Sequence, residues 1–99
     1  MAKSRGQTGI QFEMSLTAGP NGRLRTAYIH LRKAKAARTK EIVEDTVLAD
    51  YDSRGRLVGI EILGPVQIRV LASLVETPYR AAFRRFAKES IPAALCEAA

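Results

Sequence analysis

The sequence predicts an α+β fold in which a four-stranded antiparallel β-meander is followed by two or three helices packed on one face. Four stretches between residues 10 and 63 alternate apolar and polar side chains with period two, which is typical of half-buried strands. After Gly64 and Pro65, apolar residues recur at helical spacing instead. The chain of 99 residues suits one domain, residues 1–99, because two halves of about 50 would each bury little core.

Residues 10–17 and 26–32 are the first two predicted strands, with a turn between them that contains glycine, proline and Asn-Gly. The apolar side chains expected to face the core are Ile10, Phe12, Met14, Leu16, Ala27, Ile29 and Leu31. Tyr28, His30 and Arg32 alternate with these and are expected to point outward. Residues 1–9 are expected to be flexible, and residues 33–38 to form a turn that leads into an extended segment.

Residues 41–51 and 56–63 are the third and fourth predicted strands. Asp52 and Gly55 suit the first and last positions of a type I turn between them. If Tyr51 faces Arg56, the hairpin register pairs Val47 with Ile60. One face then carries Val47, Ala49, Tyr51, Val58, Ile60 and Ile62. The other carries Leu48, Leu57 and Leu63, which leaves apolar surface for a partner unless the helices cover it.

Residues 65–97 are predicted as a helical extension. Pro65 suits a first helical position, and an apolar stripe continues from Val66 to Leu74. Thr77 is the expected N-cap of a second helix that runs to about Glu89. A short third helix is expected over residues 90–95. The core side of the second helix is expected to carry Tyr79, Ala82, Phe83 and Phe86.

The hairpin sequence resembles a known family. Residues 28–31 read Y-I-H-L, and residues 50–63 read D-Y-D-S-R-G-R-L-V-G-I-E-I-L. These motifs resemble the small bacterial proteins called domain of unknown function 2283, over residues from about 10 to 63. The resemblance implies a compact β-meander with no established activity. The longer turn at residues 18–25 and the helical last third depart from the family pattern.

The net charge of +6 is unevenly distributed. Residues 1–40 carry +8, residues 41–62 carry −4 and residues 63–99 carry +2. We therefore expect neighbouring strands to offset part of the excess. A lone Cys96 cannot form an internal disulfide, and no apolar run approaches the length of a membrane span or a secretory signal. The expected compartment is the cytoplasm.

Motifs for catalysis, nucleotide binding or zinc are absent from the sequence, which predicts a protein that is not an enzyme and uses no cofactor. Asp50 and Glu61 share the outward face of the predicted hairpin and could hold a metal ion or act as acid and base. Pairing with Arg38 or Lys40 on a neighbouring strand is the expected alternative for these carboxylates. His30 is expected to be a surface histidine, because no second histidine could complete a metal site.

Two binding functions remain. The preferred one is a protein-interaction module that forms a homodimer or, by analogy with other small bacterial proteins, serves as the antitoxin-like partner of another small protein. The alternative is nucleic-acid binding, with Tyr28 and His30 stacking on bases and basic side chains contacting phosphates. The candidate contact residues for either partner are Arg32, Lys33, Lys35, Arg38, Arg80, Arg84 and Lys88.

Overall fold

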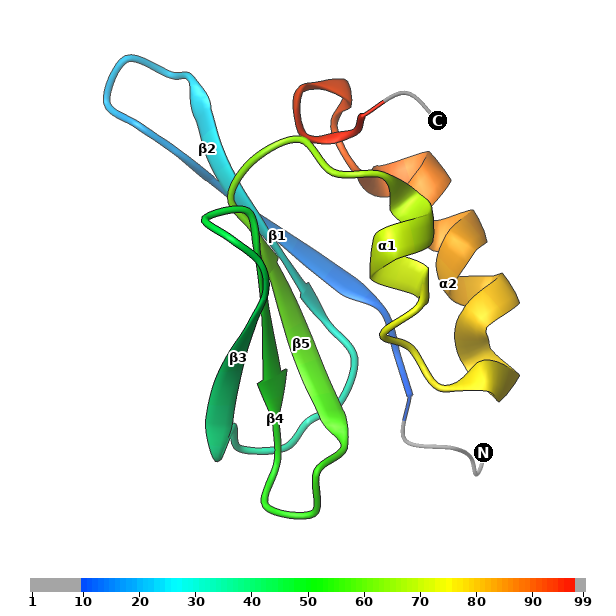
Figure 1. Ribbon diagram of the computed structural model, residues 1–99. Coiled ribbons are helices and arrows are strands. Elements are labelled where there is room, and N and C mark those ends of the chain that lie inside the picture. Colours follow the sequence, from blue (N-terminus) through cyan, green and yellow to red (C-terminus); the bar gives the residue numbers. More distant parts are fainter. Residues whose placement is uncertain (1–9, 98–99) are drawn as a thin grey trace, which may run out of the picture.

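The computed structural model describes residues 10–97 and confirms the α+β class (Figure 1). Five strands form one antiparallel sheet, and the helical last third covers one of its faces. The strands are β1 (Glu13–Ala18), β2 (Leu24–His30), β3 (Arg38–Val43), β4 (Val47–Tyr51) and β5 (Leu57–Ile62). The helices are α1 (Ile68–Ala72), α2 (Thr77–Ser90) and the 3-10 turn η1 (Ala93–Leu95). The expected flexibility of residues 1–9 lies outside the described residues.

The prediction of a single third strand over residues 41–51 is wrong, because a turn at residues 44–46 divides this stretch into β3 and β4. Asp45 takes a φ of 55°, in the left-handed region that aspartate adopts more readily than most residues. The backbone N–H of Thr46 donates to the carbonyl of Val43 at 3.0 Å and closes the turn. Without a glycine or a proline, this turn left only a weak signal in the sequence.

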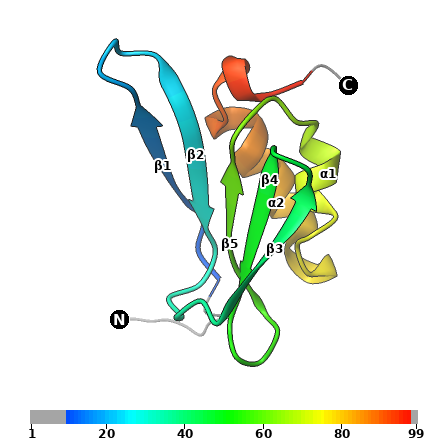
Figure 2. The same ribbon diagram turned by 60° about the vertical axis from the view of Figure 1, so that its left-hand side comes forward.

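The strand order β1-β2-β5-β4-β3 also corrects the predicted meander. β3, β4 and β5 form consecutive hairpins, and β2 pairs with β5, which is the arrangement of a Greek key (Figure 2). β5 takes the central position, and nearly all of its residues are buried there. The two edges of the sheet are therefore β1 and β3.

The turn from Asp52 to Gly55 forms as predicted, but the hairpin register differs. Gly55 has a φ of 80°, and Asp52 pairs with Arg56 through its backbone N–H at 2.9 Å. A bulge at Val58 adds a second shift, so Val47 lies opposite Ile62 rather than Ile60. The two shifts together move the register by two residues. Because side chains alternate between the faces with period two, the residues of β4 that face the core are the predicted ones. The exception is beside the bulge, where Leu57 rather than Val58 joins the main core cluster.

The carboxylate of Asp52 stabilises this turn. It accepts hydrogen bonds from the backbone N–H groups of Arg54 and Arg56, each at 2.9 Å, and from the Arg56 Nε at 2.9 Å. The hydrogen bond from the Arg56 backbone is the largest of the causes that lower the pKa of Asp52. The ion pair with Arg56 compensates the negative charge of Asp52, which is buried.

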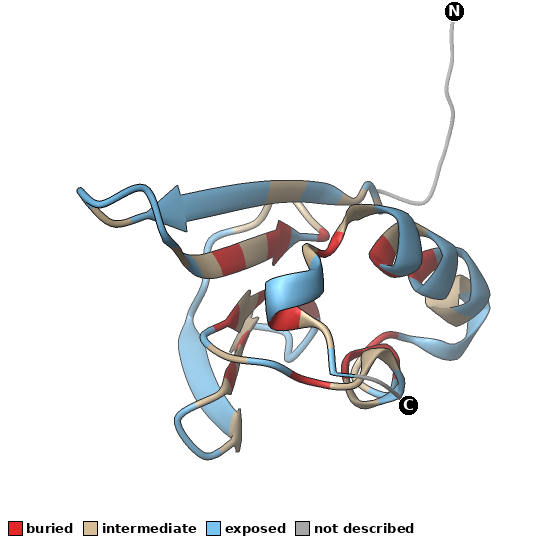
Figure 3. Cartoon of the chain, turned by 90° about the horizontal axis from the view of Figure 1, so that it is seen from above, coloured by how far each residue is buried: buried red, intermediate tan, exposed pale blue. Residues whose placement is uncertain are grey.

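The core lies between the sheet and the helices, where Figure 3 shows the buried residues. Phe83 of α2 is fully buried, and its ring meets Phe12 edge-on at 5.6 Å. The ring of Phe86 also lies near that of Phe12, with ring centroids 5.5 Å apart. The predicted inward residues of β2 and its extension are confirmed: Ala27, Ile29 and Leu31 are buried. Leu16 and Ala82, both predicted to face the core, are exposed.

Only α2 is a long helix, so the predicted pair of full helices is corrected to one main helix and a single-turn α1. Pro65 is not in a helix, because Val66 forms a parallel β-bridge with Cys96. The backbone of Val66 also accepts a hydrogen bond from Glu97 at 2.9 Å. Thr77 is the first residue of α2 rather than its cap, and its side chain makes no capping bond. No helix of residues 10–97 is long and apolar enough to span a membrane.

Arg80 joins the two helices. Its Nε donates to the carbonyl of Ala72 at 2.9 Å, and its second guanidinium nitrogen donates to the carbonyls of Val75 at 2.9 Å and Ser73 at 3.4 Å. The last carbonyls of a helix have no partner within the helix, so a side-chain donor that satisfies them stabilises the helix end. Arg80 is therefore a structural residue, and its predicted role as a contact for a partner is not supported by its position.

Substitution of Arg80 should be costly. We expect Arg80→Ala to lower the free energy of unfolding by about 1–3 kcal/mol, because half-buried carbonyls at the end of α1 lose a charged donor. Chemical denaturation followed by circular dichroism measures this change. Arg84→Ala, which truncates an exposed arginine on the same helix, should stay within about 0.5 kcal/mol of the wild type. Equal effects of the two substitutions would contradict the capping role.

Candidate functional site

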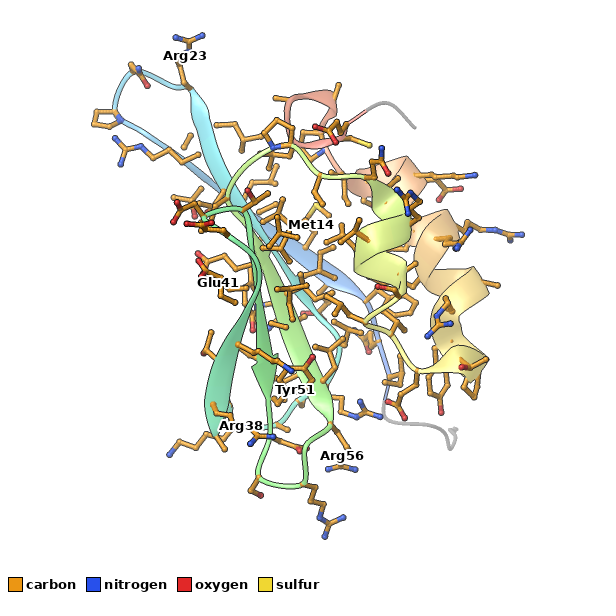
Figure 4. All side chains as sticks on the ribbon, in the orientation of Figure 1. Met14, Arg23, Arg38, Glu41, Tyr51 and Arg56 are labelled. Atoms are coloured by element: carbon orange, nitrogen blue, oxygen red, sulfur yellow. The ribbon has the colours of Figure 1, made fainter. Side chains whose placement is uncertain are left out.

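The face of the sheet away from the helices is polar, and its side chains form two rows across the strands. The strand register aligns one row from β1 to β3: Glu13, His30, Gly59, Asp50 and Thr39. A second row aligns Ser15, Tyr28, Glu61, Leu48 and Glu41. Figure 4 shows Glu41 on this open face and Met14 on the opposite, helix-covered face. The predicted outward positions of Tyr28, His30, Asp50 and Glu61 are thus confirmed.

Tyr28 links three strands on this open face. Its hydroxyl crosses β5 and donates to the Asp50 Oδ2 on β4 at 2.7 Å. The other carboxylate oxygen of Asp50 accepts a hydrogen bond from the Thr39 hydroxyl on β3 at 2.6 Å. The path of Tyr28 requires glycine at position 59, because any Cβ there would overlap the phenol ring and its hydroxyl.

This arrangement keeps the Tyr28 phenol neutral. Partial burial raises the pKa of Tyr28 above its usual value near 10, and the hydrogen bond to Asp50 raises it further. The negative charges of Asp50 and Glu61 act in the same direction. A general acid or base works best with a pKa near the operating pH, and the pKa of this phenol moves away from neutrality. The geometry therefore makes Tyr28 a hydrogen-bond donor that clamps the sheet.

Asp50 and Glu61 lie on neighbouring strands, but the partners of Asp50 differ from those predicted. The predicted pairing of Asp50 with Arg38 or Lys40 is wrong. Arg38 and Lys40 lie on the helix side of the sheet, whereas Asp50 lies on the open face. Two hydroxyl groups take their place. Residues 10–97 contain no group of three or more histidine, cysteine, aspartate or glutamate side chains that could hold a metal ion.

His30 is exposed, as predicted. Its ring meets the ring of Tyr28 edge-on, with centroids 4.5 Å apart. Two adjacent aromatic rings on an open sheet face are a surface on which bases can stack, but the Tyr28 ring is half-buried and committed to Asp50. The stacking surface is therefore smaller than the sequence pattern indicates.

The seven candidate contact residues divide into three groups. Arg32 and Arg80 have structural roles. Arg32 donates to the carbonyl of Leu57 and forms an ion pair with Glu76, and Arg80 donates to the carbonyl of Ala72. Lys33 and Lys35 are exposed in the connection from β2 to β3, and Arg38 is exposed at the first position of β3. Arg84 and Lys88 are exposed on α2.

Direct ion pairs do not offset the excess charge in the way the sequence indicated. Within residues 10–97, the ion pairs are Arg32 with Glu76 and Arg56 with Asp52. Neither joins the basic first 40 residues to the acidic segment that follows them. Arg38 and Lys40 on β3 therefore keep their charges exposed to solvent.

An open hollow of about 360 Å³ lies at the β3 edge, on the helix side of the sheet. Arg38 and Lys40 line it together with the half-buried ring of Tyr51, which lies directly opposite Arg38. Thr39 and Gly55 complete its wall. Two cations beside an aromatic ring suit an anion that carries a flat apolar group. Sequence reasoning missed this hollow because it treated residues 38–51 as one turn and one strand.

The two edge strands differ in how they are protected. β3 carries Arg38, Lys40 and Glu41 and has its own bulge at Ile42. All six residues of β1 have partners on β2, and the register shift between Thr17 and Ala18 places its extra residue, Arg25, on β2 rather than on the edge strand. Glu13 is the one charged residue of β1. Charges and bulges are the usual protection of an exposed edge against a further strand. β1 is therefore the unprotected edge.

Leu16 lies at the centre of this unprotected edge. It is 54% exposed, on the helix side of the sheet and beside the core. Leu63, after β5, is the other large exposed hydrophobic side chain of the described residues, at 36%. A separate groove of about 450 Å³ runs between Phe12 and α2, lined by Ala81, Ala82, Arg85, Phe86 and Glu89.

Comparison with known proteins finds a family similarity for part of the chain. Residues 26–64 match the family described as protein of unknown function DUF2283, which confirms the resemblance seen in the sequence. The match spans nearly all of β2 and the whole of β3, β4 and β5, and it omits β1 and the helices. It is shorter than the predicted resemblance, which began at about residue 10. Neither the curated proteins nor the solved structures contain a match to this chain.

The crossing of Tyr28 over Gly59 gives a testable dependence. We expect Gly59→Ala to displace the ring and lower the free energy of unfolding by about 1–3 kcal/mol, because a side chain is added where there is no space. Denaturant unfolding measures this cost. Gly64→Ala is the matched control, since a Cβ there meets the Thr46 methyl at an ordinary 3.9 Å.

The same variant should change the alkaline titration. The native fold keeps the phenol neutral, so the stability that Tyr28 contributes is complete below pH about 10 and is lost as the pH rises above it. Gly59→Ala breaks the bond to Asp50, so the pKa of Tyr28 should fall back toward about 10. Ultraviolet titration of the tyrosinate follows this. An unchanged titration would show that the ring does not depend on Gly59.

Proposed function

We propose that the protein is a non-catalytic interaction module that binds another protein chain along the free edge of β1. The observation that carries this proposal is the unprotected β1 edge with Leu16 exposed at its centre. A partner strand would bond to the unpaired N–H and C=O groups of β1, and its side chains would cover Leu16. The antitoxin-like partner of another small protein is one form that this function could take.

The chemistry of β1 favours a protein over a nucleic acid. Between Met14 and Ala18 the strand carries no charge. On its helix side it presents Leu16 next to Met14, which is packed against the core. Nucleic-acid binding needs positive charge along the contact, whereas strand addition needs backbone groups and an apolar pocket. β1 offers free backbone groups and apolar side chains, as strand addition requires.

Site-specific photocrosslinking tests the proposal. Leu16 is replaced by p-benzoylphenylalanine, and the irradiated adducts are identified from the cells that naturally produce the protein. We expect adducts with a protein at position 16. The same replacement at Leu63, the other exposed large hydrophobic residue, is the control and should give few. Equal yields at both positions, adducts with nucleic acid alone, or no adduct at position 16 would each overturn the proposal.

A second candidate function rests on the hollow beside β3. Arg38 and Lys40 have no ion-pair partner within residues 10–97, and Tyr51 of β4 lines the hollow with them. Phosphate oxygens could bind the two cations while a base stacks on the ring. Lys33 and Lys35 precede this edge and would extend the contact along a strand of nucleic acid.

Single-stranded oligonucleotides labelled for fluorescence anisotropy test this candidate at two salt concentrations. Arg38→Ala and Lys40→Ala should each weaken binding and reduce the salt slope by about one, because each removes one phosphate contact. Arg23→Ala is the control, since Figure 4 places Arg23 at the other end of the molecule. If the wild type does not bind at low salt, this second function is wrong.

A further inference from the structure

We propose that the chain bound along β1 is a second copy of this protein, which pairs antiparallel with β1 so that Leu16 of one copy lies opposite Leu16 of the other. This inference rests on the proposed function of β1 as a protein-binding edge and names its occupant. A two-fold axis perpendicular to the sheet then relates the copies, and one sheet continues through both. The helices of the two copies lie on the same side.

On the helix side of the sheet, apolar side chains favour this pairing. Leu16 is 54% exposed in the single chain, although Met14, two residues earlier on the same face, packs against the core. In the paired sheet each Leu16 meets its copy across the axis, while Met14 lies opposite Ala18 of the second copy. Each exposed leucine covers the other, which extends the apolar layer from one copy into the next.

On the open face of the sheet, charged side chains favour this register. A Cβ built on Gly19 would lie 2.8 Å from the Nε of Arg25, so the Arg25 guanidinium lies on the side to which residue 19 points. Residue 19 directly follows β1, and the register shift between Thr17 and Ala18 adds a residue to β2 and not to β1, so alternation along β1 places residues 13 and 19 on one face. With Leu16 on the axis, Glu13 of each copy lies opposite Gly19 of the other and beside its Arg25. Two ion pairs then form at symmetric positions.

Neighbouring registers lose these contacts. Moving the axis to Ser15 places Glu13 opposite Thr17 of the second copy, about 7 Å along the strand from residue 19. Moving it to Thr17 places Leu16 opposite Ala18 and shortens the paired segment. A shift by one residue would pair the helix side of one strand with the open face of the other.

The β3 edge does not compete. An antiparallel pair of β3 strands would bring Arg38, Lys40 and their copies close together, and like charges directly opposite one another destabilise a sheet. Pairing of β1 with β3 of another copy would leave a free edge at each end and produce fibres of growing length. The symmetric β1 pair forms a closed dimer. The edges of its continuous sheet are then the two β3 strands, which are protected by their charges and bulges.

Sedimentation of the full chain over a range of concentrations is the first test. We expect a monomer–dimer equilibrium whose midpoint moves to about tenfold or higher concentration in Leu16→Lys, because two ammonium groups then face each other across the axis. Leu63→Lys changes the other exposed leucine in the same way and should leave the midpoint unchanged. A strictly monomeric wild type, or a mass that grows without limit, would overturn the inference.

A charge exchange tests the ion pairs. Glu13→Arg alone and Arg25→Glu alone should each weaken the dimer, and the double variant should restore it. Glu13→Arg combined with Arg23→Glu has the same net charge as the restoring pair but places the acid elsewhere in the turn, so it should remain weak. Equal recovery in both double variants would show that net charge, and not this register, controls association.

Cysteine crosslinking tests the register directly in a Cys96→Ala background. Leu16→Cys should form a disulfide-linked dimer under mild oxidation, because residue 16 lies opposite itself at a cross-strand distance. Ser15→Cys should not, because residue 15 lies opposite Thr17. The reverse result would refute the axis at Leu16.

Photocrosslinking and sedimentation together separate binding of a second copy from binding of a different protein. If photocrosslinking at position 16 captures a different protein while the isolated chain sediments as a monomer, the second copy is wrong and the β1 interaction remains. If position 16 captures no protein and the chain is monomeric, both fail.

Discussion

The width of the helical layer, compared with that of the sheet, determines which parts of this molecule are buried. An α-helix with its side chains is about 10–12 Å across, whereas neighbouring strands are about 4.8 Å apart. One main helix and a single-turn α1 cannot cover five strands. The central strands β2, β5 and β4 supply most of the buried sheet residues, and some helix-side residues of the two edge strands remain exposed. Leu16 on β1 and Arg38 and Lys40 on β3 are exposed for this one reason.

The same constraint explains why the two edges differ in chemistry. At β3 the uncovered positions carry cations, so the open side of this strand is hydrated and protected from pairing. At β1 the uncovered position carries a leucine, which gains from being covered. The segment that matches the DUF2283 family contains the protected edge but not β1 or the helices. The residues outside this segment therefore form both the helices that cover the core and the β1 edge proposed for association.

Sequence reasoning succeeded where a local pattern has one physical solution. The alternation in β2 placed Ala27, Ile29 and Tyr28 on their observed faces, and the Asp52–Gly55 turn formed as expected. The register failed because the bulge at Val58 depends on contacts with other strands. The turn at Asp45 failed because aspartate is a much weaker signal than glycine for a left-handed backbone.

The candidate site was predictable only in part. The outward positions of Asp50, Glu61 and His30 follow from alternation alone. The partners of Asp50 do not, because they come from β2 and β3, whose places in the sheet depend on the Greek key order. Arg32 and Arg80 read as surface charges in the sequence, yet each donates to backbone carbonyls that are distant in the chain or belong to another helix.

The bridge between Val66 and Cys96 has a mechanical consequence. It joins the segment that enters α1 to the segment that follows η1, so the helical third forms a loop closed at its base. A helix at the end of a chain ordinarily frays from its free end, one turn at a time. Here α2 lies inside the closed loop, and Ile91 and Leu95 after it are buried in the same core as Phe83. We therefore expect the helices to separate from the sheet as one cooperative unit, in which the bridge at Cys96 must break before α2 can fray.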